Sequence, residues 1–262
     1  MVEEDALNEE LAATMDASAE LLPWLPELFI GQEDLGVRAK DALALLSVVD
    51  LPAGGSVLDL GCGKGAALIA VVERFGCSGF GLDGVEPFIA HARERSTSLG
   101  LDERVRFLCE DVRAAPGPRG SHDLVMLLAL GPIFGDTRET VGELRSWVRP
   151  GGYVLLDEAY LPNDLANDDP HWDFGVSLDE LVEELTHHGD ELVAELVYDT
   201  PEYRHWCSEV SAELQERARE LGRKEPEVAE ALERFAQRQS DETGEDEGAF
   251  VGSLFLLRRA DS

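Results

Sequence analysis

The sequence predicts an α/β protein with a mostly parallel sheet that is covered by helices on both of its faces. Three observations support this fold class. Short apolar segments alternate with longer helical ones from Ser56 onward, which is typical of strand–helix–strand units. A glycine-rich turn, Gly61 to Gly65, separates the first strand of this series from its first helix. The segment from His122 to Leu130 contains a continuous apolar run, as a strand with two buried faces requires.

The region before this series is predicted to be helical. Apolar residues recur near helical spacing over residues 4–22, which predicts one amphipathic helix. Pro23 and Pro26 would end this helix and leave an apolar turn. A second helix is predicted over residues 35–49, where apolar residues again follow a helical period.

Seven segments are predicted strands because they are short, apolar and bounded by turn residues. They are 56–60, 77–82, 105–109, 122–130, 153–157, 191–198 and 250–257. The helices predicted beside them are 66–75, 87–100, 138–148, one that begins at Ser177, 202–221 and 226–238. Acidic residues in the first turn after Ser177 suit the helix dipole. Gly222 is expected to separate the last two helices.

These elements predict a single domain over residues 1–262, near the upper size that one hydrophobic core serves. Its core sheet and helices would cover residues 51–198, and a closing strand and tail would follow at 249–262. A helical N-terminal cap, 1–50, and a helical insert, 199–248, would complete the domain.

The charge of the chain limits the classes of partner that suit it. The sequence has 54 acidic and 22 basic residues, and its formal net charge is −32. Such a field repels phosphate backbones and anionic lipids, so nucleic acid and membrane surfaces are not expected partners. The four cysteines are scattered without a CxxC pair, which predicts a reducing compartment and no zinc site. An acidic N-terminus and the shortness of the longest apolar run predict a cytoplasmic protein.

The motif Val57-Leu-Asp-Leu-Gly-Cys-Gly-Lys-Gly65 links a predicted strand to a predicted helix. Its glycines allow the backbone to approach a ligand closely, and the free N–H groups at the helix start suit an anion. The spacing fits the pyrophosphate of a dinucleotide and also the amino-acid end of S-adenosylmethionine. Asp59 favours the second ligand, because a carboxylate at this strand end can match an ammonium group. A strand-end residue that caps the turn is the alternative for Asp59.

Two further predicted strands end in acidic residues. Asp83 lies 22 residues after Gly61 and could accept hydrogen bonds from both hydroxyls of a ribose. Dinucleotide-binding folds place an acid there too, so Asp83 does not separate the two ligands. Glu110 and Asp111 end the third strand, where a carboxylate could accept from the amino group of adenine. A solvated acid pair is the alternative for these two residues.

The segments VLDLGCGKG, GLDG, EDV and RPGGYVLLDEAYL, in this order and spacing, resemble the class I S-adenosylmethionine-dependent methyltransferases. The resemblance covers about residues 55–160 and is greatest to the small-molecule branch, such as the ubiquinone/menaquinone C-methyltransferase-like enzymes. It implies a Rossmann-like sheet of seven strands, of which the last is antiparallel. It also implies a helical N-terminal segment and a helical insert before the last strand.

The resemblance assigns individual residues to the binding of S-adenosyl-L-methionine. These are Gly61, Cys62 and Gly63 at the methionine end, Asp83 and Gly84 at the ribose, Asp111 and Val112 at the adenine, and Leu128 and Ala129 near the methionine portion. After the fourth strand the sequence reads Leu130-Gly-Pro-Ile-Phe134. Many relatives that methylate nucleic acids or protein amides carry an Asn/Asp-Pro-Pro-Tyr/Phe motif there, so a small-molecule acceptor is expected instead.

Methyl transfer requires an acceptor held in line with the S–CH₃ bond, and it requires a base only where the acceptor loses a proton. His205 is the candidate base that titrates in the right range, and an exposed histidine at a helix start is its alternative. Further candidates beyond the strand ends are Asp157, Glu158, Tyr160, His171 and Trp172. Aromatic residues that could form an acceptor wall, or else pack in a core, are Trp24, Phe29, Phe134, Tyr203 and Trp206. His187 and His188 point two ways on one helix, so no metal site is expected.

The sequence therefore predicts S-adenosylmethionine-dependent methyl transfer to a small molecule by a monomer or homodimer. A nicotinamide-dependent oxidoreductase is one alternative, against which Asp59 and the lack of a matching catalytic pair count. A catalytically silent S-adenosylmethionine-binding module is the other, because methyl transfer needs no obligatory catalytic residue.

The acidic excess predicts that KCl stabilises the folded protein. The Debye length falls from about 30 Å at 0.01 M salt to about 3 Å at 1 M, so added salt screens the repulsion among the acids. We expect the melting temperature, measured by calorimetry, to rise steeply at first and then to level off. A melting temperature that stays constant from low to molar salt would show instead that the acids are well separated or locally paired.

Overall fold

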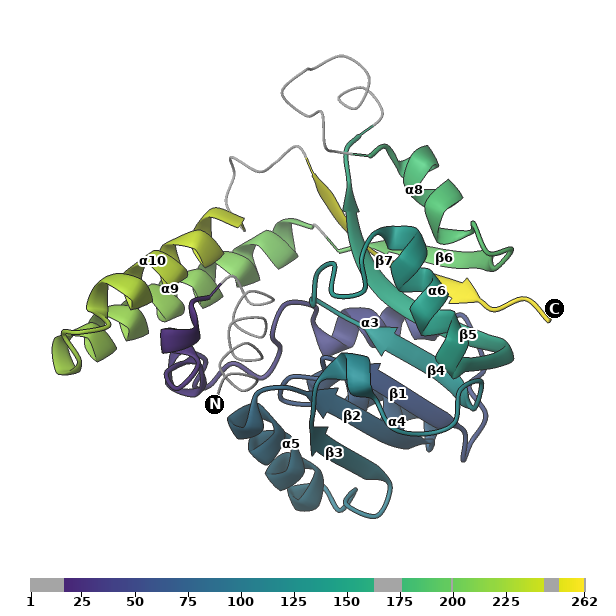
Figure 1. The fold of residues 1–262 in the computed structure, drawn as a ribbon, viewed down its shortest axis with the longest axis horizontal. Coiled ribbons are helices and arrows are strands. Elements are labelled where there is room, and N and C mark those ends of the chain that lie inside the picture. Colours follow the sequence, from purple (N-terminus) through teal and green to yellow (C-terminus); the bar gives the residue numbers. More distant parts are fainter. Residues whose placement is uncertain (1–16, 163–175, 199, 243–249, 262) are drawn as a thin grey trace. The chain divides into compact units, whose positions relative to one another are not determined.

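The computed structural model describes residues 17–162, 176–198, 200–242 and 250–261. Its seven strands form one sheet in the order β3-β2-β1-β4-β5-β7-β6 (Figure 1). They are β1 (Ser56–Leu60), β2 (Ser78–Asp83), β3 (Val105–Cys109), β4 (His122–Leu127), β5 (Val148–Tyr160), β6 (Glu191–Val197) and β7 (Val251–Arg258). The pairs among β1 to β5 are parallel, and β7 runs antiparallel to both β5 and β6. The predicted fold class and the antiparallel last strand are therefore confirmed.

The chain divides into two compact units. The larger unit takes residues 33–198 and 251–262 and contains the sheet, and the smaller unit takes residues 1–32 and 199–250. The division after Gln32 falls within the residues expected as an N-terminal cap, and the helix that follows packs within the larger unit. The division into cap, core and insert stays a prediction.

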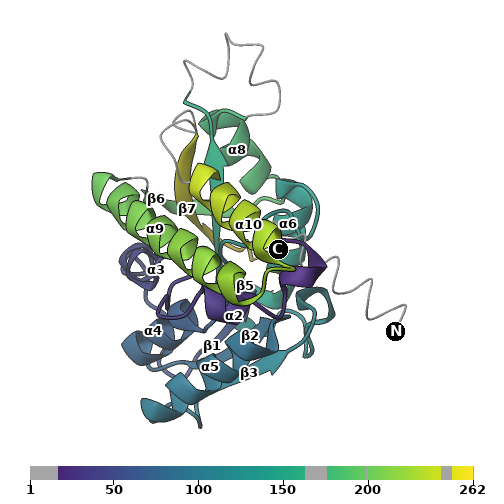
Figure 2. The same ribbon diagram turned by 90° about the vertical axis from the view of Figure 1, so that its left-hand side faces the viewer.

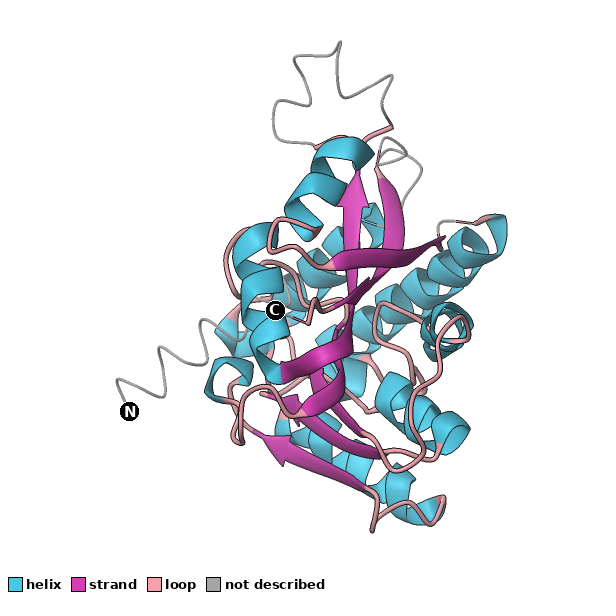
Figure 3. Ribbon diagram, turned by 90° about the vertical axis from the view of Figure 1, so that its right-hand side faces the viewer, coloured by secondary structure: helices cyan, strands magenta, loops and turns pink. Residues whose placement is uncertain are grey.

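Helices cover both faces of the sheet within the larger unit (Figure 3). They are α3 (Ala39–Leu46), α4 (Ala66–Phe75), α5 (Glu86–Ser98), η2 (Val112–Ala114), α6 (Thr137–Trp147) and α8 (Leu178–Leu185). One apolar cluster joins α3, α4 and α5 to one face, and a second cluster joins α6 and α8 to the other. Successive strand residues alternate between these clusters, so Val57 faces α3 and α4 while Leu58 faces the side of α6.

Several element ends differ from the sequence prediction for local reasons. The helix predicted over 35–49 begins only at Ala39, whose N–H donates to Asp34 Oδ1 at 2.8 Å. The strand predicted to reach Leu130 ends at Leu127, because Ala129 adopts a left-handed conformation with φ 53°. The helix predicted to begin at Ser177 is confirmed: Ser177 caps α8, and its N–H and hydroxyl both donate to Glu180.

The smaller unit is helical in its described residues. Its elements are η1 (Ala19–Leu21), α2 (Leu25–Leu28), α9 (Pro201–Lys224) and α10 (Ala229–Glu242). The turn expected around Pro26 is wrong, since α2 forms there and a proline is tolerated in the first helical turn. Most of the helix expected over residues 4–22 lies outside the described residues.

The break predicted at Gly222 is also wrong, because α9 continues through it to Lys224. Figure 2 shows α9 and α10 side by side, and the two helices pack together within their unit. A Cβ atom on Gly222 would lie 2.9 Å from the Cβ of Ala229, which opens α10. The glycine therefore serves the close approach of two helices and does not end one of them.

The described part of the chain has no helix that is both long and apolar enough to cross a membrane.

Candidate functional site

The glycine-rich turn lies between β1 and α4, at the carboxyl ends of the parallel strands. Gly61, Gly63 and Gly65 have φ values of 78°, 50° and 76°, which side-chain-bearing residues rarely adopt. The N–H groups of Gly61 and Cys62 both donate to the carbonyl of Leu82 on β2, at 2.9 and 2.8 Å. The turn is therefore attached to the neighbouring strand and can present its remaining backbone to a ligand.

Asp83 connects this turn to the next one. Its Oδ2 accepts the N–H of Gly63 and its Oδ1 accepts the N–H of Val85, both at 2.8 Å. Burial raises the pKa of Asp83, and these two hydrogen bonds oppose the increase. The sequence motifs predicted a ligand-binding role for Asp83 but not this structural one. Each carboxylate oxygen has a second lone-pair site, so the two roles are compatible.

Asp59 is almost fully buried, with 2% of its surface exposed, and it faces the side of α3 and α4. Burial, and to a smaller extent the negative charge of Asp83, raise its pKa to about 7. Within the described part of the chain, no residue donates a hydrogen bond to the Asp59 carboxylate, so it does not cap the turn there. The structure thus holds a buried acid beneath the glycine-rich turn without a cationic partner among those residues.

The end of β3 carries the residues expected at the adenine. Asp111 accepts the N–H of Arg113 at 2.9 Å and forms an ion pair with its guanidinium group at 2.7 Å. These interactions, led by the side-chain hydrogen bond, lower the pKa of Asp111. Val112 is buried and opens η2, and Glu110 is exposed. The expected contacts to adenine remain predictions.

The residues that follow β4, 128–130, are called the β4 exit. They contact residues from distant parts of the chain. Leu128 is buried, whereas Ala129 is exposed and donates its N–H to Asp157 Oδ1 on β5 at 2.7 Å. Burial raises the pKa of Asp157 to about 6, although the bond from Ala129 lowers it. A Cβ on Gly61 would lie 2.7 Å from the side chain of Leu130, so the β4 exit packs directly on the glycine-rich turn.

Residues 33–38 contact both the glycine-rich turn and the β4 exit. These contacts were not predicted from the sequence. A Cβ atom added to Gly63 would lie 3.2 Å from the side chain of Leu35. A Cβ atom added to Gly36 would overlap the Cβ of Ala129. Glu33 connects the start of the segment to α5 through a hydrogen bond with His91 and an ion pair with Arg95, each at 3.0 Å. Nothing in the sequence around Gly36 signals these contacts, because they depend on tertiary packing.

The described catalytic candidates belong to β5 and α9. Tyr160 is buried against the cluster of α6 and α8, and its hydroxyl donates to Glu195 on β6 at 3.0 Å. His205 belongs to the smaller unit, and its side chain is 75% exposed at 3.6 Å from Glu209. His171 and Trp172 lie outside the described residues. A catalytic role for any of these residues remains a prediction.

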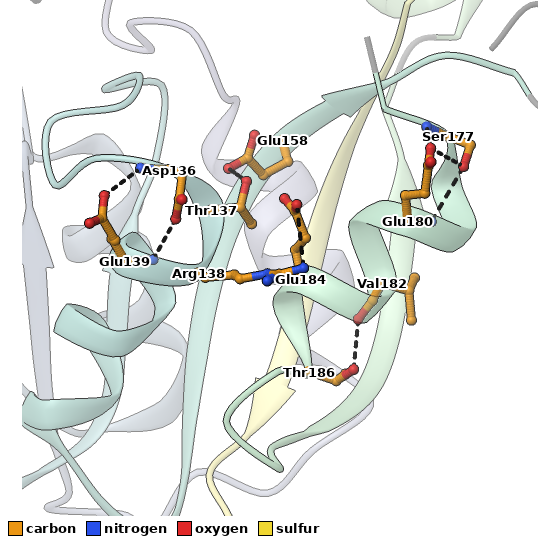
Figure 4. A network of polar contacts seen from close by, with 10 residues as sticks. All are labelled: Asp136, Thr137, Arg138, Glu139, Glu158, Ser177, Glu180, Val182, Glu184 and Thr186. Atoms are coloured by element: carbon orange, nitrogen blue, oxygen red, sulfur yellow. Dashed lines mark hydrogen bonds and ion pairs between the residues drawn. The ribbon is translucent and has the colours of Figure 1, made fainter. Parts of the chain in front are cut away.

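Glu158 points away from Asp157, as successive strand residues must. Figure 4 shows it beside the start of α6 and near α8, where Thr137 donates to it at 3.4 Å. Burial, Asp157 and Glu184 raise the pKa of Glu158 to about 7. Glu184 in turn lies 3.9 Å from the guanidinium group of Arg138. This acid therefore belongs to the interface of α6 and α8 with the sheet.

The aromatic candidates for acceptor binding are divided between the units. Trp24, Phe29, Tyr203 and Trp206 belong to the smaller unit, and Phe134 belongs to the larger one. Phe29 packs edge-to-face on Phe235 with 6.1 Å between ring centroids, and Tyr203 lies 5.5 Å from Trp206. Phe134 packs at the α6 side of the sheet. Acceptor contacts from these residues remain predictions.

No three His, Cys, Asp or Glu residues of the described ranges are grouped so that they could hold a metal ion.

Comparison with known proteins identifies the central part of the chain. Residues 57–152 match a family model described as a methyltransferase domain. This central segment is therefore similar to S-adenosylmethionine-dependent methyltransferases. The matched segment begins in β1 and ends in β5, so it includes the glycine-rich turn, Asp83, Asp111 and Ala129.

Curated relatives agree with this identification over part of their length. A demethylmenaquinone methyltransferase of Thermus thermophilus is 35% identical over 103 residues, which cover 39% of this chain and 46% of that protein. A 27-O-demethylrifamycin SV methyltransferase of Amycolatopsis mediterranei is 28% identical over 162 residues, 58% of this chain and 59% of that protein. The first curated relatives are thus matched over about half of their length or less.

A solved methyltransferase of Geobacter sulfurreducens, in complex with S-adenosyl-L-homocysteine, has the same fold. It matches with a TM-score of 0.73 and 21% identity, over 88% of this chain and 95% of that one. At this identity the likeness establishes the fold alone.

We predict that Asp59→Asn stabilises the unliganded protein in a pH-dependent way. The folded-state pKa of Asp59 is about 7 against an ordinary value of 3.8, so its ionisation opposes folding increasingly between about pH 4 and 7. The gain should be absent near pH 4 and reach up to about 4 kcal/mol above pH 7, at about 1.36 kcal/mol per pKa unit.

Urea unfolding at several pH values measures this gain, with the exposed Asp50→Asn as a matched control that should change little. A stability difference that is the same at every pH would contradict the assignment of a buried, uncompensated charge to Asp59.

Proposed function

We propose that this protein transfers the methyl group of S-adenosyl-L-methionine to a small-molecule acceptor. The observation that carries the proposal is the buried carboxylate of Asp59 beneath the glycine-rich turn. An ammonium group bound there would compensate its charge, whereas a pyrophosphate would meet two nearby acids, Asp59 and Asp83. The methyltransferase domain match supports the same reaction class.

The proposed roles follow the order of the strand ends. Gly61, Cys62 and Gly63 would line the methionine end, with Asp59 facing its ammonium group. Asp83 would accept from the ribose hydroxyls with the lone pairs that its two backbone bonds leave, and Gly84 would lie beside the ribose.

At the adenine, Asp111 would accept from the amino group and the N–H of Val112 would donate to the ring. Asp111 already holds Arg113, so the amino group would share the carboxylate with a guanidinium group. Glu110 is the second acid that could serve there, and it is exposed. Leu128 and Ala129 would pack against the methionine portion.

Methyl transfer from S-adenosyl-L-methionine requires few chemical steps to be carried out by side chains. The methyl group on a sulfonium ion is already activated, so the protein mainly orients the acceptor in line with the S–CH₃ bond and excludes water. Orientation of this kind lowers a barrier by as much as about 7–11 kcal/mol in ideal cases. A base is required only for an acceptor that loses a proton on methylation.

A small-molecule acceptor suits the charge of the chain and the names of its relatives. A net charge of −32 disfavours nucleic acid, whose phosphates would be repelled. The relatives include proteins named for demethylmenaquinone and 27-O-demethylrifamycin SV methylation. We propose a cytoplasmic monomer or homodimer that acts without a nucleic-acid partner or a metal.

A second candidate function is an S-adenosylmethionine-binding protein that does not transfer the methyl group. One solved structure of the same fold is named a [4+2]-cyclase, SpnF, with a TM-score of 0.69 and 16% identity over 92% of this chain. A shared fold therefore does not by itself establish methyl transfer. Turnover of S-adenosylmethionine with a library of small metabolites separates the two functions.

The proposed cofactor predicts a selective thermal shift. S-adenosylhomocysteine at 100 times its dissociation constant should stabilise the protein by about 2.7 kcal/mol, whereas NAD and NADP should leave the melting temperature unchanged. Asp59→Leu, which removes the charge that matches the ammonium group, should reduce the shift. A shift with NAD but none with S-adenosylhomocysteine would contradict the proposal and favour an oxidoreductase.

Gly36→Ala should weaken the binding of S-adenosylhomocysteine, because the new Cβ would overlap the Cβ of Ala129 and displace residues 33–38. Gly54→Ala is the matched control: its φ of 79° resembles the 91° of Gly36, but its Cβ would meet no described atom within 4 Å. We expect an affinity loss of at least about tenfold, which is 1.4 kcal/mol, for Gly36→Ala alone.

Isothermal titration calorimetry of both variants gives the comparison. Adding Ala129→Gly to Gly36→Ala removes the overlapping atom and should restore most of the affinity. Equal affinity losses for Gly36→Ala and Gly54→Ala would mean that backbone strain, and not the contact with Ala129, is responsible.

A further inference from the structure

Ala129 adopts a backbone conformation that its residue type disfavours. Among the described residues it is the one non-glycine with a positive φ, 53°. A Cβ atom makes the left-handed region unfavourable, so the surrounding structure must hold the residue there. Ala129 lies just beyond the end of β4, at the sheet edge that carries the glycine-rich turn. The conformation is therefore imposed at the candidate cofactor site.

Asp157 supplies the interaction that holds Ala129. It follows Leu156, which pairs with Leu127 of β4, so its carboxylate lies level with the β4 exit. Its Oδ1 accepts the Ala129 N–H at 2.7 Å, a short charge-assisted bond. An N–H that donates to a carboxylate stabilises its ionised form, so the bond from Ala129 opposes the rise in the pKa of Asp157 that burial causes.

The conformation of Ala129 determines what the next residues contact. Turning the chain at Ala129 brings the side chain of Leu130 against Gly61 and the Cβ of Ala129 against Gly36. Both partners belong to segments that border the site, namely the glycine-rich turn and residues 33–38. Release of Ala129 would therefore move the surface that these three segments share.

We propose that Asp157 is a positioning residue for the cofactor site. By holding Ala129 in the left-handed conformation, it fixes the β4 exit against the glycine-rich turn and so sets the surface on which the methionine portion of S-adenosyl-L-methionine rests. This inference rests on the proposed function, and it assigns Asp157 no contact with the cofactor and no part in proton transfer.

The test compares four variants by calorimetric titration with S-adenosylhomocysteine. Asp157→Ala removes the acceptor and should weaken binding at least about tenfold, as the loss of one charge-assisted hydrogen bond would. Asp157→Asn retains an amide oxygen that can accept the same N–H and should stay within about threefold of the parent protein. Ala129→Gly alone gives the reference affinity for the double variant, since glycine adopts a positive φ without steric cost.

The double variant Asp157→Ala with Ala129→Gly separates positioning from other roles. If Asp157 acts through the conformation of Ala129, glycine should recover at least about threefold of the lost affinity, because its left-handed conformation needs no clamp. A purely structural contribution of Asp157 to the sheet would show no such coupling to residue 129.

Asp123→Ala is the matched control for a general loss of stability. Asp123 also accepts a backbone N–H, that of Ser56 at 2.8 Å, but it lies near the start of β4 at the opposite edge of the sheet. This variant should lower the melting temperature and leave the affinity for S-adenosylhomocysteine unchanged. All titrations are made well below the melting temperature of the least stable variant, which circular dichroism establishes.

The outcomes are distinguishable. Parent protein that binds S-adenosylhomocysteine, with Asp157→Ala binding equally well, overturns the positioning role and leaves the proposed function intact. Weak binding by Asp157→Ala that Ala129→Gly does not relieve also overturns it, because Asp157 would then act by another route. Parent protein that does not bind S-adenosylhomocysteine at all overturns the proposed function and the inference together.

Discussion

The carboxylate of Asp83 is the interaction on which the geometry of the candidate site depends. It accepts one N–H from the glycine-rich turn and one from the turn that precedes α5, so a single side chain fixes two ligand-facing loops relative to each other. Charge-assisted bonds of this kind contribute about 1.5–3 kcal/mol each, and a buried N–H left without a partner costs a similar amount. The backbone shape of the candidate site is thus set by the same acid that the proposed function assigns to the ribose hydroxyls.

The same arrangement has an electrostatic cost in the unliganded protein. Asp83 lies close enough to Asp59 to raise its pKa, and neither acid has a cationic partner whose contact would cancel the repulsion in the described structure. A ligand that brings an ammonium group and two hydroxyl donors supplies what this pair lacks. A pyrophosphate brings further negative charge to the same place. Under the proposed function, the discrimination between the two classes of cofactor would therefore reside in buried charge more than in the spacing of the glycines.

Features of the fold and the candidate site that depend on neighbouring residues could be predicted from the sequence, whereas features that depend on residues far apart in the chain could not. The sheet and the acids at the strand ends follow from local pattern, which a single sequence records well, and the antiparallel last strand was implied by the family resemblance. The bond from Ala129 to Asp157 and the contact of Gly36 with Ala129 join residues that are distant in the chain. Gly222 shows the same limit: a glycine usually ends a helix, yet this one allows α10 to approach α9.

Strand alternation explains why three acids lie on the side of the candidate site and a fourth faces the other side of the sheet. Asp59 and Asp157 face the side of α3 and α4, and Asp83 reaches the glycine-rich turn from the end of β2. Glu158, the next residue after Asp157, must face the opposite side, where Thr137 and Glu184 surround it. Asp157 of β5 thereby reaches the residues that follow β4, while its neighbour Glu158 lies among residues of α6 and α8. A shift of β5 by a single residue would exchange these roles, so the register of β5 against β4 is itself a requirement for the site.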